Sequence, residues 1–333
     1  MKAVEITSQY ELHVAERPQP LPQEGEVLLR VAYAGFCGSD LNTWRGLNAM
    51  ATFPRIPGHE IGAVVEALGT GLPADLPFKV GDVVTVNPYT ACGHCAACRR
   101  GRSNACENNE TLGVQRNGAM QEYAVLPWTK IIPVKGVTVR DCALIEPMSV
   151  GFHAVSRGQV TDSDTVMIIG CGMVGLGAVV AAAQRGAQVI AADIDDDKLD
   201  LARLLGATHT LNTLKPNAAI VPEPDVVVEA VGCAPTYRMA VDKVAFTGRV
   251  VCIGYAKQDI SLTTQLFVKK ELDIRGSRNA TPADFEAVIR YLQGGQCPTD
   301  RLISAVVTPD KAADAMQRWH EAPGKVFRIL VQF

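Results

Sequence analysis

Short apolar runs separated by glycine and proline occupy the first part of the chain, up to about residue 126. Clear examples span residues 25–33, 61–67, 81–86 and 121–125. Many short strands with turn residues between them are typical of a compact β domain. The N-terminal part of the chain is therefore predicted to be β-rich.

The pattern changes near residue 149. From there on, continuous apolar runs at 166–169, 189–192, 226–231 and 250–253 alternate with helical stretches. Strands that are buried on both faces have such runs, so we predict a parallel sheet with helices on each side.

A helical stretch at 282–293 is followed by two more strand candidates, 302–307 and 326–331. We expect this last segment to return to the first domain. The predicted division is a catalytic domain of residues 1–150 and 294–333 and a nucleotide-binding domain of residues 151–293.

Length and composition agree with two ordinary globular domains: 333 residues, 47% hydrophobic and 20% charged. A net charge of −3 gives no reason to expect nucleic acid or an anionic membrane as a partner. The N-terminus has no apolar core of signal-peptide length, and the longest apolar run, 175–183, is too short to span a bilayer. We expect a cytoplasmic protein.

Four cysteines lie close together in one loop, residues about 88–108, and they are Cys92, Cys95, Cys98 and Cys106. Four thiolates match the tetrahedral shell of a closed Zn²⁺ site. A disulfide ladder is the alternative, which a reducing cytosol disfavours. Four protein ligands leave no open position, so this zinc is predicted to hold a loop and to catalyse nothing.

A glycine motif follows the apolar run 166–169 directly: Gly170, Gly172 and Gly175 fit G-x-G-x-x-G. A helix-like segment and a second apolar run ending in Asp193 complete the context of a dinucleotide site. Gly170 is expected to allow the tight turn, Gly172 the approach of the pyrophosphate, and Gly175 the packing of the helix. Asp193 is expected to bind the ribose hydroxyls.

The residues after Asp193 are acidic and include no arginine for a 2′-phosphate, which favours NAD over NADP. Lys198 is a candidate for the ribose and equally for a solvated helix face. The predicted cofactor residues are Gly170, Gly172, Met173, Val174, Gly175, Asp193, Lys198, Val231 and Ile253.

Further ligand-type residues lie in three separate segments: Cys37, the pair His59 and Glu60, and Glu146. Each one alone is as well explained by packing or by a surface pair. Together they offer sulfur, nitrogen and oxygen donors from separate loops, as in a catalytic zinc site with an open position. Spacing alone leaves these two interpretations balanced.

With these motifs the chain resembles the zinc-dependent medium-chain dehydrogenases of the alcohol dehydrogenase superfamily over nearly its full length. The resemblance rests on residues 37–40, 58–60, the four-cysteine loop, Glu146-Pro147 and the glycine motif. Residues 146–150 are similar to the polyol branch that contains sorbitol dehydrogenase. Residues 269–282 resemble bacterial sugar-acid enzymes such as L-galactonate 5-dehydrogenase. The implied fold is α/β, with a GroES-like β-rich catalytic domain and a Rossmann doubly wound domain.

The resemblance implies a catalytic zinc held by Cys37 and His59, with Glu60 and Glu146 as carboxylates at the metal. Which glutamate binds directly, and which through water, stays open. Ser39 is implied to hydrogen-bond the alcohol and to pass its proton outward. Polyol dehydrogenases commonly have a histidine where this chain has Asn42, so the exit route of the proton is open.

The implied reaction is the oxidation of a secondary hydroxyl of a polyol or sugar acid to the ketone, through a zinc alkoxide and hydride transfer to C4 of NAD. Trp44 is a candidate wall of the substrate pocket, with a core role as the alternative. Arg278 is a candidate for a substrate carboxylate or hydroxyls, with a solvated surface role as the alternative.

Two other functions stay open from the sequence. One is a dehydrogenase or reductase of small diols or simple ketones, such as butanediol. The other is a non-catalytic nucleotide sensor, which is disfavoured because every expected catalytic ligand is present. The family resemblance also implies a homodimer or homotetramer, so the expected partners are two zinc ions, NAD, a small-molecule substrate and further copies of the chain.

Overall fold

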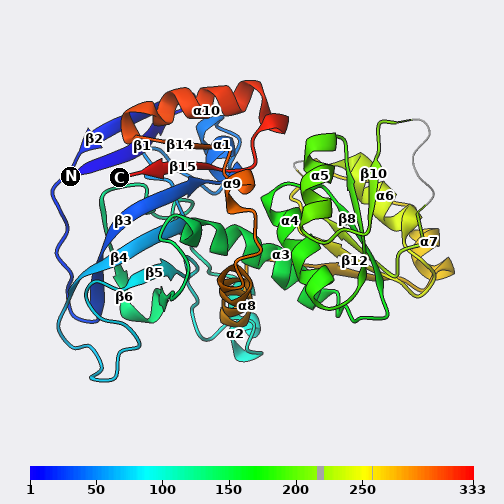
Figure 1. The fold of residues 1–333 in the computed structure, drawn as a ribbon, viewed down its shortest axis with the longest axis horizontal. Helices are drawn as coiled ribbons and strands as arrows, with labels where there is room; N and C mark the ends of the chain where they lie inside the picture. Colours follow the sequence, from blue (N-terminus) through cyan, green and yellow to red (C-terminus); the bar gives the residue numbers. More distant parts are fainter. Residues whose placement is uncertain (216–220, 257) are drawn as a thin grey trace. The chain divides into compact units, whose positions relative to one another are not determined.

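The computed structural model describes residues 1–215, 221–256 and 258–333. The chain forms two compact units (Figure 1). Unit 1 contains Met1–Glu146 and Ile289–Phe333, and unit 2 contains Pro147–Val288. Within the described ranges, no helix has both the length and the apolar character needed to cross a membrane.

Unit 1 is built on a mostly antiparallel sheet in the order β14-β15-β3-β4-β5-β7, with β6 also paired to β3. A separate ribbon joins β1 (Lys2–Ser8) to β2 (Glu11–Glu16). The strands of the sheet are β3 (Glu26–Phe36), β4 (Glu60–Leu68), β5 (Val83–Val86), β6 (Tyr123–Pro127), β7 (Ile131–Pro133), β14 (Ala305–Val307) and β15 (Ile329–Gln332). The four short apolar runs expected in this region are therefore confirmed as β3 to β6.

The last strand of the chain, β15, pairs with β3, whose sequence lies almost 300 residues earlier in the chain. Helix α10 (Ala312–Glu321) packs beside this sheet through Ala312, Ala315, Met316 and Trp319, which recur at the three- and four-residue spacing of one helix face. The other helices of this unit are short: α1 (Gly38–Trp44), α2 (Ala96–Arg99) and α9 (Thr299–Leu302).

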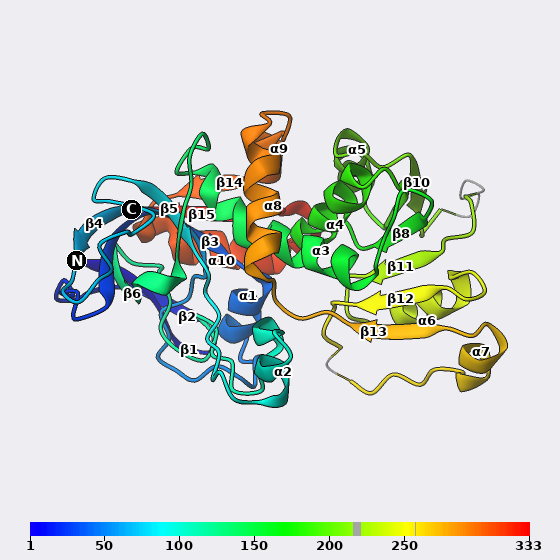
Figure 2. The same cartoon turned by 90° about the horizontal axis from the view of Figure 1, so that it is seen from below.

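Unit 2 contains a six-stranded parallel sheet in the order β10-β9-β8-β11-β12-β13. Its strands are β8 (Thr165–Ile169), β9 (Gln188–Asp193), β10 (His209–Asn212), β11 (Val226–Glu229), β12 (Arg249–Cys252) and β13 (Asp273–Gly276), and Figure 2 shows the last three side by side. Its helices are α3 (Ile145–Arg157, whose first two residues belong to unit 1), α4 (Met173–Gln184), α5 (Asp196–Leu204), α6 (Ala234–Lys243), α7 (Thr264–Lys269) and α8 (Pro282–Gln293, whose last turn belongs to unit 1).

The predicted doubly wound parallel sheet is confirmed, and so is the helix at 282–293. One predicted strand is longer than the strand that the structure forms. Residues 226–231 were predicted as a strand, but β11 ends at Glu229. The chain turns there because Glu229 binds the next backbone amides with its side chain. The strand order reverses between β8 and β11, and doubly wound folds bind ligands beyond the carboxyl ends of the strands at such a point.

Candidate functional site

The four cysteines of the loop lie together in unit 1. The sulfur atoms of Cys92, Cys95, Cys98 and Cys106 all lie within 4.8 Å of one another. Backbone amides turn inward toward them, since the amide of Cys98 donates to Cys95 Sγ at 3.5 Å and that of Cys92 to Cys106 Sγ at 3.3 Å. No disulfide joins any cysteine in the part of the chain that the structure describes. Four sulfur donors at this separation fit a closed zinc site.

Amide hydrogen bonds also favour a thiolate within this cluster. The amides of His94 and Cys95 donate to Cys92 and lower the pKa of its thiol to about 6. Burial instead raises the pKa of the Cys98 thiol to about 11. A divalent cation binds only the deprotonated thiol, so metal binding would release the protons that remain on the cluster.

A second group of ligand atoms is formed by Cys37, His59 and Glu60, again within 4.8 Å of one another. Strand pairing explains why they meet. Gly35 of β3 lies opposite Glu60 of β4, so Cys37, just after β3, lies beside His59, just before β4. This chain path requires Gly58, whose φ is +100° and at which a Cβ atom would lie 2.9 Å from the amide of Met120.

Buried polar atoms at this group have no hydrogen-bond partner among the described residues: Ser39 Oγ, His59 Nδ1 and Oε1 of Glu60. Buried polar atoms are normally satisfied, so their clustering around three metal-ligand side chains indicates a place for a cation and a polar ligand. The donor set of sulfur, nitrogen and oxygen suits zinc. The residues present therefore fit the metal.

Mutual charge controls the protonation of this group. Burial opposes a thiolate at Cys37, but the charges of His59 and Arg328 outweigh it and lower the pKa of the thiol. Burial also opposes a charged His59, yet the Cys37 thiolate raises the pKa of the imidazole well above its ordinary value. Burial raises the pKa of Glu60, against the charge of Arg328. A cation bound here would take the place of the proton on His59.

Glu146 does not belong to the group whose ligand atoms lie within 4.8 Å. It is buried in the first turn of α3, and its Oε1 accepts a hydrogen bond from the hydroxyl of Tyr89. Glu60 is thus the carboxylate that lies with Cys37 and His59, whereas Glu146 lies with Tyr89. The metal-binding roles of both glutamates stay predictions.

Sequence reasoning missed Arg328, which lies just before β15. Its side chain is buried, Nη1 donates to the carbonyl of Phe36 at 2.5 Å, and Nε lies 3.0 Å from Oε2 of Glu60. Nothing near Arg328 in the sequence indicates this contact, because its partners lie at the opposite end of the chain. Tyr89 was missed for the same reason.

A local signal was available for Asp40. It is fully buried, and its Oδ2 accepts from the amide of Cys37 at 2.8 Å, three residues earlier. This is the spacing of a capping box at a helix start. Asp40 therefore fixes the start of α1, which bears Ser39.

Trp44 ends α1 and is 3% exposed. Its ring packs edge-on against Tyr10 at 4.9 Å and against His320 at 5.5 Å, within the core of unit 1. This packing favours the core role over the substrate role. Arg278, in unit 2, is half-buried and lies two residues after β13. Its predicted contact with substrate stays a prediction.

The glycine motif forms the turn between β8 and α4. Gly170 has φ +93°, and a Cβ atom at Gly175 would lie 1.8 Å from the carbonyl oxygen of Gly170, so the first helical turn requires glycine. A Cβ atom at Gly172 would meet nothing within 4 Å. Gly172 thus faces open space within its unit, as a phosphate-binding position needs. Met173 and Val174, the first two residues of α4, stay predicted cofactor contacts.

Asp193 ends β9 beside this turn. Its Oδ2 accepts from the amide of Cys171 at 2.6 Å and its Oδ1 from the amide of Ile194 at 2.7 Å. The carboxylate is held in place and still has free lone pairs for ribose hydroxyls. Lys198 lies in the first turn of α5, where its amide donates to Asp195.

Val231 and Ile253 follow β11 and β12. Val231 is 49% exposed and lies beside Gly170, where an added Cβ atom would come within 2.5 Å of its side chain. Sequence reasoning missed Glu229, which is fully buried and accepts from the amides of Val231 at 3.0 Å and Gly232 at 2.8 Å. The sequence did offer one signal for Glu229, because it is a charged residue at the end of an apolar strand.

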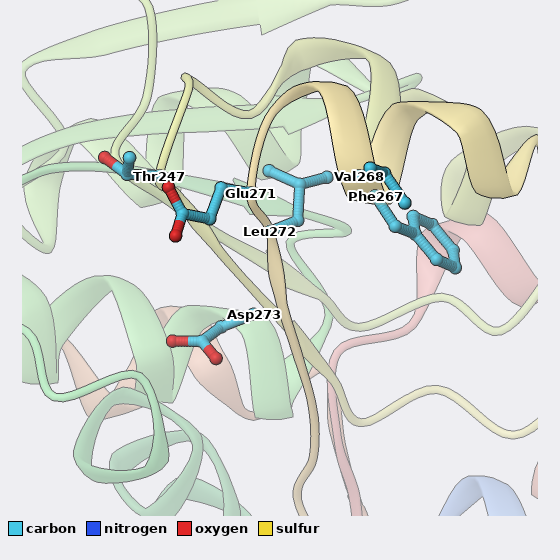
Figure 3. Close-up of a pocket in the computed structure, with 6 residues that line it drawn as sticks. All are labelled: Thr247, Phe267, Val268, Glu271, Leu272 and Asp273. Carbon is cyan, nitrogen blue, oxygen red and sulfur yellow. The ribbon is translucent and has the colours of Figure 1, made fainter.

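A surface pocket of unit 2 lies between α7 and β13 (Figure 3). Its lining consists of Thr247, Phe267, Val268, Glu271, Leu272 and Asp273. None of the site residues predicted from the sequence is among them.

Comparisons with known proteins agree with this geometry. The alcohol dehydrogenase GroES-like domain matches residues 23–136, and the zinc-binding dehydrogenase family matches residues 173–294. L-galactonate-5-dehydrogenase of Escherichia coli K12 is 34% identical over 88% of each chain. Sorbitol dehydrogenase of Bacillus subtilis 168 is 32% identical, covering 99% of this chain and 97% of the relative.

A solved structure is similar over the whole chain. It is described as a short chain alcohol dehydrogenase (rspB) from E. coli CFT073 complexed with NADH. Its TM-score is 0.90 at 30% identity, and the match covers 100% of this chain and 99% of that one.

Proposed function

We propose that this chain, which belongs to the zinc-dependent medium-chain alcohol dehydrogenases, oxidises a secondary hydroxyl of a polyol or sugar acid to the ketone, with NAD as the hydride acceptor. Within that family it belongs to the branch of polyol and sugar-acid enzymes that use NAD(P). The observation that carries the proposal is the buried group Cys37, His59 and Glu60, beside a Ser39 hydroxyl that no described residue binds. The predicted cytoplasmic location and oligomeric assembly are kept as predictions.

In this proposal Cys37, His59 and Glu60 hold the catalytic zinc. When bound there, zinc supplies a Lewis acid that lowers the pKa of a coordinated hydroxyl. Ser39 would hydrogen-bond the substrate hydroxyl and, on taking up its proton, release its own hydroxyl proton toward water, since its Oγ is buried at the start of α1 and has no protein partner in the described ranges. The carbonyl of Ser39 accepts from Thr43 Oγ1 at 3.0 Å, which fixes the serine for this role.

The carboxylates have separate tasks in the proposal. Arg328 compensates the charge of Glu60 at 3.0 Å, so this buried carboxylate can take part in the site without a second cation. Tyr89 holds the carboxylate of Glu146 by a hydrogen bond. Glu60, whose ligand atom lies with those of Cys37 and His59, would bind the metal, and Glu146 would act on it through a water molecule.

NAD is favoured over NADP by the charges around Asp193. Lys215 forms an ion pair with Asp196 at 2.7 Å, and the sequence places three more aspartates on the same stretch, Asp193, Asp195 and Asp197. A 2′-phosphate brought to Asp193 would be repelled, whereas ribose hydroxyls can donate to it.

The four-cysteine loop holds the second, structural zinc.

The test is a substrate panel of alditols, aldonates and small diols, each with NAD and NADP, read by the absorbance of the reduced cofactor. We expect turnover of alditols or aldonates with NAD, two zinc ions per chain by elemental analysis, and loss of turnover after chelation. Turnover confined to small diols would refute the substrate class. A chain that binds NADH but oxidises nothing in the panel would support the nucleotide-sensor alternative.

A further inference from the structure

The guanidinium of Arg116 is partly buried in unit 1 and has no partner there. Its Nε and Nη2 atoms are both buried, and no described residue accepts a hydrogen bond from them. These two atoms carry three of the five N–H donors of an arginine. A buried charged donor without an acceptor destabilises the fold, so an arginine kept in this state points to a ligand that supplies the acceptor.

A second cation, Lys130, is tied to the loop that bears Arg116, because it binds the carbonyl of Tyr89 and Tyr89 forms an antiparallel bridge with Thr111. Lys130 is half-buried at the end of a short 3₁₀ turn, Trp128–Lys130, and its Nζ donates to the carbonyl of Tyr89 at 2.6 Å. Burial and the charge of Arg116 both lower the pKa of Lys130. Glu110 acts on Arg116 from a distance but forms no ion pair with it in the described ranges. Two neighbouring cations that repel each other are stabilised by an anion placed between them.

Both cations are attached to segments that carry the candidate metal centre. The loop of Arg116 packs on the segment before His59: a Cβ atom at Gly113 would lie 2.5 Å from the amide of Gly58, and the amide of Ala119 donates to the carbonyl of Gly58 at 2.9 Å. Lys130 binds the backbone of Tyr89, whose hydroxyl binds Glu146.

We propose that Arg116 and Lys130 form a subsite for an oxyanion group of the substrate, a carboxylate or a phosphate ester, at the end remote from the reacting hydroxyl. The proposal rests on the dehydrogenase function proposed above and narrows its substrate to an anionic sugar derivative. The planar guanidinium offers parallel N–H donors that match two oxygens of one anion, and the ammonium adds a point charge. This assigns to Arg116 the carboxylate-binding role that sequence reasoning considered for Arg278.

The experiment uses the zinc-loaded full-length enzyme and three substrate sets on one carbon skeleton: hexonates, the matching hexitols and the hexitol phosphates. The variants are Arg116→Met, Arg116→Lys and Lys130→Met. Arg55→Met is the matched control, because the guanidinium of Arg55 lies in the same unit but already has a protein acceptor, with Nη2 donating to Thr52 Oγ1 at 2.7 Å. Initial rates give kcat and KM, and calorimetry measures binding of the best hexonate and of inorganic phosphate without cofactor.

We expect Arg116→Met to lower kcat/KM for the anionic substrate about 100-fold, mostly through KM, since it removes two charge-assisted hydrogen bonds. Turnover of the neutral hexitol should change less than about threefold. Arg116→Lys should recover part of the loss, and Arg55→Met should match wild type. A larger effect on hexitol phosphates than on hexonates would identify the anion as phosphate.

Equal losses on anionic and neutral substrates, or no loss, would overturn the subsite. If the wild-type enzyme oxidises none of the three sets, the proposed function fails, and the binding measurement then decides the subsite alone. Anion binding by wild type that is lost in Arg116→Met supports the subsite, and absence of anion binding by wild type overturns it.

Discussion

Replacing Glu229 with alanine should weaken both unit 2 and its binding of NADH. Glu229 is fully buried at the end of β11. Its Oε1 accepts three hydrogen bonds, from the amides of Val231 at 3.0 Å and Gly232 at 2.8 Å and from the hydroxyl of Thr236 at 2.7 Å. These bonds fix the turn after β11, beside the glycine motif, and join it to the first turn of α6.

The size of the effect follows from the donors left without an acceptor. A buried donor that loses its acceptor lowers the free energy of unfolding by about 1–3 kcal/mol. Water that enters the space left by the side chain can accept some of these hydrogen bonds and so reduces the effect. With three donors, Glu229→Ala should lower the free energy of unfolding of this unit by about 3 kcal/mol. Glu229→Gln keeps an acceptor oxygen and should cost about 1 kcal/mol, and Thr236→Val, which removes one donor, should cost about as much.

Urea denaturation followed by circular dichroism measures the stabilities, and quenching or enhancement of NADH fluorescence measures the Kd. We expect Glu229→Ala to raise the Kd of NADH at least about tenfold, and Glu229→Gln less than about threefold, because only the alanine variant releases the turn. The reasoning is refuted if Glu229→Ala unfolds within about 0.5 kcal/mol of wild type, the range of ordinary surface substitutions.

Three further predictions concern other parts of the chain. Cys95→Ala should lose one zinc per chain and most of its soluble yield, because a structural zinc contributes folding energy; a well-folded variant that still contains two zinc ions would contradict this. Asp193→Ser should lower kcat/KM for NAD about 100-fold and reduce the preference over NADP, since the serine cannot accept from both ribose hydroxyls; an unchanged preference would contradict it. Hydrogen bonds from His153 and Thr281 outweigh burial and lower the pKa of Asp284, so its stabilising effect is present above about pH 4 and is lost as pH falls through the folded pKa. Asp284→Asn should therefore lower the free energy of unfolding at pH 7 by about 2 kcal/mol, the value of a hydrogen bond to a charged group. The difference from wild type should narrow below about pH 4, and a difference that stays constant with pH would contradict the assignment.

The features that the sequence could predict are those with a local or periodic signal. Four cysteines spaced within one loop, and glycines between a strand and a helix, carry their geometry in their spacing. Cys37 and His59 could be grouped only by resemblance, because the pairing of β3 with β4 brings them together.

The features that were missed depend on contacts between distant segments. Arg328 reaches Phe36 and Glu60 from the far end of the chain, and Tyr89 reaches Glu146 across more than fifty residues. Arg116 has no motif at all and is recognised only by its buried, unpartnered nitrogen atoms. For Trp44 the sequence left a pocket role and a core role open, and its packing on Tyr10 and His320 favours the core role.

We infer that Cys37, His59 and Glu60 hold the zinc at which oxidation occurs, whereas the four-cysteine loop holds a zinc that only stabilises the fold. The most direct test measures zinc content, NADH binding and turnover together for Cys37→Ala. We expect one zinc per chain, an unchanged Kd for NADH and no measurable turnover. Near-normal turnover in this variant, or loss of the zinc from the four-cysteine loop instead, would contradict it.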